Sequence, residues 1–375
     1  IFSVNKQINP DTRQEFKNIF KKMFINNISI ILDELSDHQI RLLAKLFGDW
    51  IDHILPLSLV EGLNIRFEFY KKLIRGWEIE QLHTFTGYFY NDNFKVFAIL
   101  ARRKGAKYIG HTHGNNNYIE THYKFSNVLR IVDYYTTYGI RVTDDLLNNP
   151  GSKNVKLVPI GSVSFHALKK WNKSELSFKN FTLLYPSGPL RDFMPDLQEI
   201  SPEKKLDHRL QVLDFIEQLL IKYSGLRVLY KPFPGTFTND PIKEKCAKWF
   251  DEGRIELTEK HPGDLYHSVD VVLWDTISTG FVESIVAGVP VIVFNSAYEY
   301  EQTTPCGKLV NDTLKEAGVQ CFDINNAIWS FERIMNDLDS YKKDTAPSIQ
   351  MVTEDMGNPV SRKEWHRRFR EGLYP

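Results

Sequence analysis

The sequence predicts an α/β protein with parallel sheets, and three patterns support this fold class. From about residue 176 onward, short β-branched runs alternate with longer segments of helical periodicity. Residues 271–273 and 289–294 are continuously apolar, as expected of parallel strands that are covered on both faces. The chain has 375 residues, 42% of them hydrophobic, which exceeds the usual size of one core and predicts two domains with a cleft between them.

The first half, residues 1–175, is predicted to be an α/β domain that begins with an unusual series of helices. Apolar periodicity predicts helices over residues 13–24, 37–54, 67–85 and 94–104. Strands are expected over residues 106–110, 128–136 and 155–160. A polar stretch over residues 170–179 is the expected linker to the next domain.

The second half alternates regularly between strand and helix, which predicts a doubly wound, Rossmann-like domain over residues 176–345. Its expected strands cover residues 181–185, 227–230, 255–257, 271–273, 289–294 and 319–322. Longer helices are expected over residues 204–223, 262–269, 303–317 and 325–341. In such a domain the ligand lies beyond the carboxyl ends of the strands. Residues 346–375 form an extension, irregular at first, that ends in a helix over residues 361–371.

The turn after the apolar run 271–273 is the clearest sign of a ligand site. The polar residues at the start of its helix are Thr276, Ser278 and Thr279. The first N–H groups of a helix are unpaired and its dipole is positive there, so an anion is the expected ligand. Gly280 would let a ligand approach the backbone, Glu283 would grip a ribose diol, and Asp275 would position the loop. The alternative is an ordinary capped helix after a buried strand.

A histidine-rich loop follows the strand expected over residues 106–110. His111 and His113 stand two apart at the strand end, so their side chains face the same way. An imidazole titrates near neutrality, and either residue could take a proton from an acceptor hydroxyl as a general base. Two alternatives stay open: a metal site that also uses His122, and histidines that only hydrogen-bond the loop.

Asp133 is expected to end an apolar strand, where its carboxylate could act as a base or as the nucleophile of a retaining mechanism. It could equally cap the turn. Asp337 and Asp339 resemble an Asp-x-Asp metal motif only superficially, because they lie late in a predicted helix with no strand before it. Metal-independent chemistry is therefore expected.

Composition excludes several kinds of partner. Lys plus Arg equals Asp plus Glu at 47 each, so no global field draws the chain to nucleic acid or to an acidic membrane. The three cysteines, Cys246, Cys306 and Cys321, lack metal-ligand spacing and indicate small core residues in a reducing compartment. There is no charged leader and no run of about 18 apolar residues, which predicts a cytoplasmic protein.

The last predicted helix is strongly basic. Its cations are Arg362, Lys363, Arg367, Arg368 and Arg370. They could bind the phosphates of a lipid-linked acceptor or the inner face of the membrane. A solvated helix that packs through Trp365 and Phe369 is the favoured interpretation.

Three stretches resemble bacterial surface-carbohydrate transferases of the GT-B class. They are residues 47–50 with 69–77, residues 111–118 continuing through 122 to 139, and residues 276–290. The resemblance spans the chain from about residue 40 to about residue 300. It implies a GT-B fold, in which two Rossmann-like domains enclose a cleft, here with a helical N-terminal elaboration.

A second resemblance concerns the sugar donor. In GT-B enzymes that use CMP-sugars, such as sialyltransferases and Kdo transferases, a Lys-x-His-Pro segment and a later Ser-Ser or Ser-Thr pair hold the cytidine nucleotide. Here Lys231-Pro-Phe-Pro234 and Ser278-Thr279 match these segments, and Lys231 keeps a charge that neutralises phosphate. Phe233 replaces the histidine, a departure that questions the phosphate contact at that position. Arg191 is expected to reach another donor phosphate.

The histidine of the Lys-x-His-Pro pattern has one further candidate in this chain. His261-Pro262 is a literal His-Pro pair, but it lies in a different turn, before a predicted helix. It is either a displaced ligand-side residue or a helix start.

The resemblances imply an enzyme that moves a sugar from a nucleotide donor to a growing bacterial surface polysaccharide. The donor would be CMP-Kdo or another CMP-activated acidic sugar, and the acceptor a lipid-linked glycan of lipopolysaccharide O-antigen or capsule. No cofactor is expected besides this donor substrate, because helix-terminal N–H groups and cations would stabilise the leaving phosphate. Alternatives from other classes are a sugar-nucleotide epimerase and a non-catalytic carbohydrate-binding or assembly module.

Overall fold

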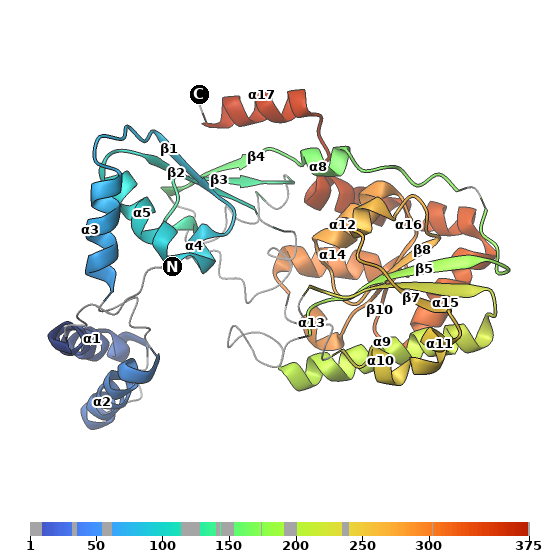
Figure 1. Ribbon diagram of the computed structural model, residues 1–375, viewed down its shortest axis with the longest axis horizontal. Helices are drawn as coiled ribbons and strands as arrows, with labels where there is room; N and C mark the ends of the chain where they lie inside the picture. Colours follow the sequence, from blue (N-terminus) through green and yellow to red (C-terminus); the bar gives the residue numbers. More distant parts are fainter. Residues whose placement is uncertain are drawn as a thin grey trace. The chain divides into compact units, whose positions relative to one another are not determined.

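The computed structural model contains two compact units, Ile1–Tyr108 and Ile109–Pro375. The residues that it describes are 10–31, 36–54, 62–112, 114, 128–139, 143, 154–173, 175–190, 201–234, 240–301 and 303–373. The α/β class with parallel sheets, predicted from the sequence, is confirmed (Figure 1). The domain boundary predicted at residue 175 falls between the last strand of a smaller sheet and the first strand of a larger one.

The first unit packs helices around a small apolar core. Its elements are α1 (Pro10–Ile31), α2 (Asp37–Ile54), α3 (Leu63–Leu73), β1 (Gln81–Thr84), α4 (Gly87–Tyr90) and α5 (Asp92–Arg103). Ile74, Val96 and Leu100 are buried where α3 and α5 meet. The helix predicted over residues 67–85 is wrong beyond Leu73. The chain turns there, and β1 pairs beside β2, so sheet pairing overrides the helical pattern.

The smaller sheet has the order β1-β2-β3-β4. Its parallel strands are β2 (Lys107–His111), β3 (Tyr134–Thr137) and β4 (Lys156–Pro159). The strand predicted over residues 128–136 is wrong at its start, because residues 128–131 form a helical turn. Val128 and Leu129 are buried in that turn, so their apolar character reflects packing and not a strand. Asp133 therefore precedes β3 instead of ending a strand.

The larger sheet lies within the second unit and holds six parallel strands. They are β5 (Phe181–Pro186), β6 (Leu226–Lys231), β7 (Ile255–Leu257), β8 (Val271–Trp274), β9 (Val291–Phe294) and β10 (Gln320–Cys321). Their order is β10-β9-β8-β5-β6-β7, so the chain builds outward from β5 to β7, returns to β8 and builds outward again. This is the Rossmann order, and its direction reverses between β5 and β8. Ligands of such sheets bind at that switch point, beyond the carboxyl ends of the strands.

Helices cover the larger sheet, with α9 on one side and α12 on the other (Figure 1). The helices of this part are α8 (Val163–His166), α9 (Pro202–Lys222), α10 (Ile242–Lys245), α11 (Ala247–Asp251), η4 (Pro262–Asp264), α12 (Thr279–Ala287), α13 (Ala297–Glu301), α14 (Pro305–Glu316), α15 (Ile324–Asn336) and α16 (Leu338–Val352). The strands are sealed between them: Leu183, Val228, Val272 and Ile292 are all 0% exposed. Burial on both faces explains why β8 and β9 are continuously apolar.

Two predicted helices in this region differ from the structure. The helix expected over residues 262–269 is reduced to the single turn η4. The helix expected over residues 325–341 is divided at Asp337, whose side chain accepts the Ser340 N–H at 2.9 Å and so caps α16. Helix α16 continues to Val352, so the region beyond residue 345 is helical and not irregular.

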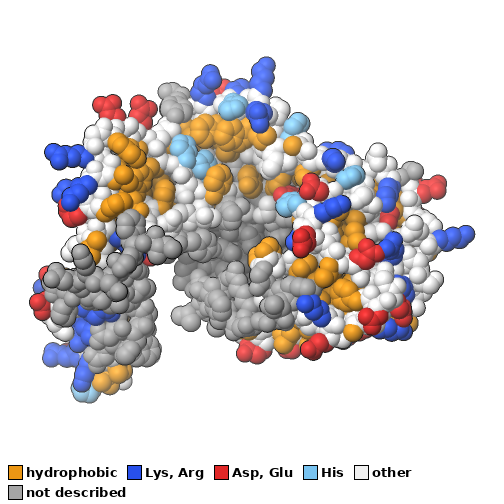
Figure 2. All heavy atoms as spheres, viewed as in Figure 1, with side chains coloured by type: hydrophobic (Ala, Val, Ile, Leu, Met, Phe, Trp, Pro, Cys, Tyr) orange, Lys and Arg blue, Asp and Glu red, His pale blue; other side chains and the backbone are white. Residues whose placement is uncertain are grey.

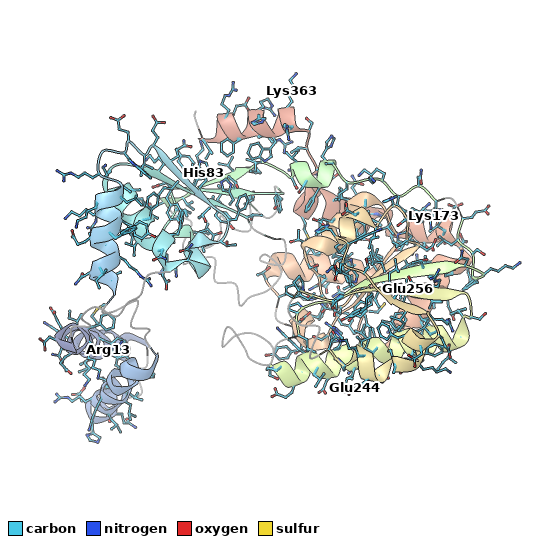
Figure 3. The ribbon with its side chains drawn as sticks, viewed as in Figure 1. Arg13, His83, Lys173, Glu244, Glu256 and Lys363 are labelled. Atoms are coloured by element: carbon cyan, nitrogen blue, oxygen red, sulfur yellow. The ribbon has the colours of Figure 1, made fainter. Side chains whose placement is uncertain are left out.

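The last helix, α17 (Arg362–Leu373), packs against the smaller sheet. Trp365 and Phe369 lie against Ile109 and Val158, which confirms the packing predicted from these two rings. Some of its charge is neutralised within the helix, because Glu364 pairs with both Arg367 and Arg368 and Glu371 pairs with Arg367. Basic side chains stand at the surface over this helix (Figure 2), and Lys363 is labelled in Figure 3.

The structure also bears on the cysteines and on membrane insertion. Cys246 and Cys321 are buried and unpaired, and burial raises the pKa of each thiol to about 12, as expected of core residues. The side chain of Cys306 lies outside the described residues. Among the helices of the described ranges, none combines the length and the apolar character that a membrane span requires.

Candidate functional site at the switch point

Helix α12 begins just beyond β8, with its amino end at the switch point. Ser278 has extended backbone, and its Oγ accepts the Phe281 N–H at 3.4 Å, which is an N-cap arrangement. Thr276, Ser278 and Thr279 are all partly exposed. The positive end of the helix dipole and three accessible hydroxyl side chains make this turn suited to an anion.

Gly280 has a packing role in the structure that the sequence did not predict. A β-carbon at this position would come within 2.3 Å of Cη2 of Trp274. That indole is held in place, since its Nε1–H donates to Ser284 Oγ at 3.2 Å. The Tyr266 hydroxyl donates to the Gly280 carbonyl at 3.0 Å and fixes the same turn. Protein packing therefore requires glycine here, while the hydroxyls suited to a ligand lie earlier in the turn.

Glu283 lies one turn into α12 and is partly buried. Burial raises the pKa of its carboxyl, and the nearby His261 opposes this rise. Burial, and after it the charge of Glu283, also raise the pKa values of the Tyr138 and Tyr266 hydroxyls. The Glu283 carboxyl therefore interacts with two phenols and an imidazole in a partly buried environment. A carboxylate so placed can accept hydrogen bonds from two neighbouring hydroxyls, such as those of a ribose.

His261 takes the helix-start role that the sequence offers as one of two interpretations. Its Nδ1 accepts the Gly263 N–H at 3.1 Å, so it caps the short turn η4 as a helix-start residue does. Its ring is exposed, and its charge opposes the rise in the pKa of Glu283.

Lys231 is the last residue of β6, and the loop after it carries the phenylalanine that replaces the expected histidine. The one polar contact described for Lys231 Nζ is the Pro232 carbonyl at 3.4 Å, which is a long hydrogen bond. Phe233 is 36% exposed, and its N–H donates to Ser187 Oγ at 3.2 Å. This bond ties the loop after β6 to the loop after β5, which brings Lys231 to the switch-point side of the sheet.

A buried ion network lies under these loops. Asp275, the first residue after β8, accepts the Tyr185 hydroxyl at 2.9 Å and the Gly188 N–H at 2.8 Å. It also pairs with Arg209 at 3.0 Å, and Arg209 pairs with Asp240 at 2.5 Å. The three charged side chains are each at most 5% exposed. Asp275 thus positions the surrounding loops, as the sequence suggested, and its oxygens are used within the protein.

The smaller sheet separates two of the predicted catalytic residues. Ile109 lies opposite Tyr134, and His111 lies opposite Thr136. His111 therefore ends β2 at the carboxyl edge, whereas Asp133 precedes β3 at the amino edge. The separation along the strands is about 10 Å at roughly 3.3 Å per residue. The prediction that Asp133 ends a strand is wrong, and the sheet does not bring it to His111.

His111 is 6% exposed and held on two sides. Its Nδ1 lies 2.8 Å from Thr136 Oγ1, and its ring stacks on Phe369 with centroids 6.4 Å apart. These contacts fix the orientation of the imidazole at the carboxyl edge of β2. The other predicted residues His113 and Arg191, and His122 of the metal alternative, lie outside the described residues.

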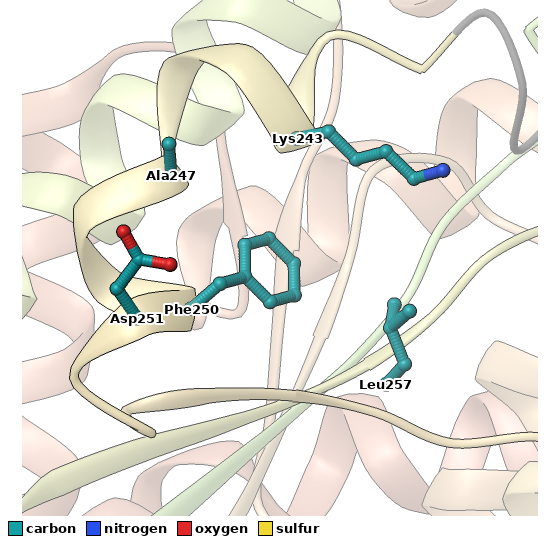
Figure 4. Close-up of a pocket in the computed structure, with 5 residues that line it drawn as sticks. All are labelled: Lys243, Ala247, Phe250, Asp251 and Leu257. Carbon is teal, nitrogen blue, oxygen red and sulfur yellow. The ribbon is translucent and has the colours of Figure 1, made fainter.

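Among the described residues, neither a metal-ligand cluster nor the hollow beside β7 contributes to the switch-point site. Within the described part of the chain, no three His, Cys, Asp or Glu side chains are grouped as metal ligands. A shallow hollow of ≈ 240 Å³ lies between α10, α11 and the edge strand β7 (Figure 4), lined by Lys243, Ala247, Phe250, Asp251 and Leu257. Because β7 is two strands away from β5, this hollow is not part of the switch-point site.

Sequence reasoning missed the buried network around Arg209, although one signal pointed to it. Arg209 belongs to the apolar stripe of α9, followed at helical spacing by Val212, Leu213 and Ile216. A cation within such a stripe is expected to be buried and paired. Nothing near Asp240 in the sequence marks it as the partner, because the pairing depends on the fold.

Solved structures with a similar fold include sugar-nucleotide enzymes. S. aureus MnaA, solved with UDP, shares 13% identity at a TM-score of 0.52 over 83% of this chain and 80% of that one. UDP-GlcNAc 2-epimerase from Neisseria meningitidis, bound to UDP-GlcNAc, shares 12% identity at a TM-score of 0.52 over 84% and 81% of the two chains. The pneumococcal O-GlcNAc transferase GtfA reaches a TM-score of 0.48 at 14% identity, over 82% of this chain and 60% of that one.

The first two likenesses confirm the predicted GT-B fold, and at such identities they show the fold alone. No curated protein matches the sequence. Residues 3–340 match the model of the LIC12162 family transferase, which covers most of the sequence. The chain therefore belongs to the LIC12162 family of transferases.

Proposed function

We propose that the chain is a nucleotide-sugar-dependent glycosyltransferase whose donor binds at the switch point of the larger sheet. The observation that carries this proposal is the position of the α12 amino end, one turn before Glu283, beyond β8 at that switch point. Membership of a transferase family supports a group-transfer reaction. The same fold in structures solved with UDP and with UDP-GlcNAc supports a nucleotide-linked donor.

The residues of this edge match the parts of such a donor. The hydroxyls of Thr276, Ser278 and Thr279, with the first N–H groups of α12, would cradle a phosphate. Lys231 would neutralise it, and Arg191, assigned from the sequence alone, would contact a second phosphate oxygen. Glu283 would accept hydrogen bonds from the ribose. Gly280 supports this arrangement by packing on Trp274, so its role is structural.

Transfer requires a stabilised leaving phosphate and a base for the acceptor hydroxyl. The helix end and Lys231 would supply the first, because both present positive charge where the phosphate departs. We assign the base to His111, with His113 as the second candidate. The imidazole would take the hydroxyl proton while the acceptor oxygen bonds to the sugar carbon and the sugar–phosphate bond breaks.

For the nucleotide we propose cytidine, as CMP-Kdo or another CMP-activated acidic sugar. The support is the resemblance of Lys231 and the Ser278-Thr279 pair to the segments of CMP-sugar transferases. Uridine is the competing choice. Calorimetry of the full chain with CMP, UDP, GDP and dTDP tests both the donor site and the identity of the nucleobase. We expect a single clear preference, for CMP. A preference for UDP overturns the cytidine assignment, and binding of none overturns the donor site.

For the acceptor we propose a lipid-linked glycan of a bacterial surface polysaccharide, O-antigen or capsule. The test is incubation of the preferred nucleotide-sugar with and without such a glycan. A transferase releases the nucleotide efficiently only when the acceptor is present. Isomerisation of the donor sugar without any acceptor would instead identify an epimerase and overturn the transferase assignment.

A further inference from the structure

We infer that Arg209 is a positioning residue of the nucleotide site, whose buried guanidinium holds the loops after β5, β6 and β8 in the arrangement that binds the donor phosphates. The inference rests on the proposed function and extends it to a side chain that does not face solvent. Arg209 is 3% exposed in α9, so it would act through its neighbours and not by touching the nucleotide.

The guanidinium contacts one group beyond each of these three strands. Its Nη1 lies 2.5 Å from Asp240 Oδ2, in the segment that follows β6. Its Nη2 lies 3.0 Å from Asp275 Oδ2, directly after β8. The same Nη2 donates to the Gly188 carbonyl at 2.8 Å, after β5. One planar group therefore contacts all three loops.

The loop after β5 is held on both sides of one residue, Gly188. Arg209 donates to the Gly188 carbonyl, and Asp275 accepts the Gly188 N–H at 2.8 Å. A β-carbon on Gly188 would lie only 2.9 Å from Asp275 Oδ1, so the backbone is pressed against that carboxylate. Neither group can shift without moving the other.

The loop of Lys231 is tied to the same network through hydroxyl groups. The Tyr230 hydroxyl donates to Asp240 Oδ2 at 2.5 Å and lies 3.1 Å from Ser187 Oγ. Ser187 Oγ in turn accepts the Phe233 N–H at 3.2 Å. Displacement of Arg209 would therefore reach the backbone beside Lys231. Phosphate binding would weaken, because charge-assisted contacts depend on donors held in a fixed place.

Lysine is the informative substitution at this position. Lysine keeps the positive charge that offsets the two buried carboxylates, but its ammonium is a point charge that cannot span both as the planar fork does. Removing the charge altogether would leave Asp240 and Asp275 without a cation and would threaten the fold. Arg209→Lys thus changes the geometry and retains the charge.

Arg254 provides a matched control at the opposite edge of the sheet. Its guanidinium donates to the carbonyls of Leu220, Tyr223 and Leu226 at 2.6 to 3.2 Å, near the amino ends of β6 and β7. Arg254→Lys therefore breaks a comparable fork far from the carboxyl edge. Both variants are examined as full chains, by thermal unfolding and by calorimetry with CMP against cytidine and UDP against uridine.

The nucleotide–nucleoside pairs isolate the phosphate contribution. We expect Arg209→Lys to lose about 10-fold or more of the affinity for the preferred nucleotide, while the affinity for its nucleoside changes less than about 2-fold. Arg254→Lys should leave both affinities unchanged. Equal losses for nucleotide and nucleoside, or unchanged nucleotide binding in Arg209→Lys, overturn the positioning role and leave the proposed function standing. A wild-type chain that binds no nucleotide overturns both.

A milder variant covers the case in which Arg209→Lys does not fold. Tyr230→Phe removes only the hydroxyl that joins Asp240 to Ser187. A phosphate-selective loss of about 3-fold or more supports the inference, since one hydrogen bond of the network is missing. Wild-type affinity for the nucleotide in this variant overturns it.

Discussion

Trp274 and Gly280 are packed so closely that position 280 has no room for a side chain. Trp274 is the last residue of β8, and Gly280 is the second residue of α12. The contact locks the end of the strand to the first turn of the helix. The direction in which the helix presents its amino end is thereby fixed by apolar packing, whether or not a ligand is bound.

Gly280→Ala is expected to destabilise the protein. Helix propensity alone would favour alanine by roughly 1 kcal/mol. Overpacking against Trp274 opposes this with about 1–3 kcal/mol, so the net change should be a loss of stability. Urea unfolding measures it, and the same substitution in a Trp274→Phe background is the control. The cost of the alanine should shrink there, because the smaller ring leaves space. A stabilised Gly280→Ala variant contradicts the packing argument.

Ser278→Asp is expected to separate helix capping from anion binding. Aspartate caps a helix as well as serine does, and its charge is favourable at the positive end of the dipole. Stability should therefore be kept, while a carboxylate in the proposed phosphate site should reduce nucleotide affinity by about 10-fold or more. Ser361→Asp, at the start of α17, is the matched control and should leave binding unchanged. Unaltered nucleotide binding by Ser278→Asp would remove the anion site from this turn.

Glu283→Gln is expected to raise stability at neutral pH and to weaken nucleotide binding. Burial raises the pKa of Glu283 above its ordinary value, so the folded chain holds this proton more tightly than the unfolded chain does. The wild-type fold then loses stability as the pH rises from the unfolded pKa through the folded pKa. Glutamine stays neutral and removes that loss. Binding should fall about 10-fold, because the amide offers ribose one acceptor oxygen and no charge.

Urea unfolding from about pH 4 to about pH 8 measures the stability difference, which should vanish at the acidic end. Glu332→Gln is a control of opposite sign. Hydrogen bonds from Lys222 and Tyr223 lower the pKa of Glu332, so its charge helps the fold above the unfolded pKa and this help is lost as the pH falls. A Glu283→Gln variant that is less stable than wild type at pH 7 would contradict the assignment of a costly buried charge.

His111→Phe is expected to slow turnover strongly while the stack on Phe369 is kept. Phenylalanine preserves the ring contact but cannot accept a proton, so kcat should fall by about 100-fold or more if His111 is the base. Stability should fall by about 1–3 kcal/mol, because Thr136 Oγ1 loses its partner.

Thr136→Val is the matched control for the histidine. It removes the same hydrogen bond and retains the imidazole, so its kcat should stay within about 10-fold of wild type. Steady-state kinetics with the donor and the acceptor compare the two variants. Equal kcat values in both would show that His111 serves packing and not proton transfer.

Strands buried on both faces could be predicted well from the sequence. The apolar runs of β8 and β9 are continuous because Val272 and Ile292 are fully buried between helices. The same signal failed at Val128 and Leu129, which are just as apolar but are buried in a helical turn. Burial explains apolar residues in both places, and only the backbone pairing of the fold distinguishes them.

The candidate site could be predicted at the level of its turn, but not of its packing. Ser278 carries a capping signal in the sequence itself, and it caps α12 as expected. The role of Gly280 could not be derived, because the contact with Trp274 depends on how the helix leaves the strand. The position of Asp133 was predicted wrongly for a related reason. The strand begins at Tyr134 and not at Val128, so Asp133 lies at the amino edge of the smaller sheet.

Helices α16 and α17 have a practical consequence for anyone who shortens this chain. The Tyr341 hydroxyl contacts both the N–H and the carbonyl of Val291, and the rings of Trp365 and Phe369 cover Ile109. The stretch shared with the family ends at residue 340, so a fragment trimmed there loses all of these groups. Such a fragment would expose apolar residues of both sheets to solvent and is expected to aggregate on expression. The residues of the proposed donor site would nevertheless all be present.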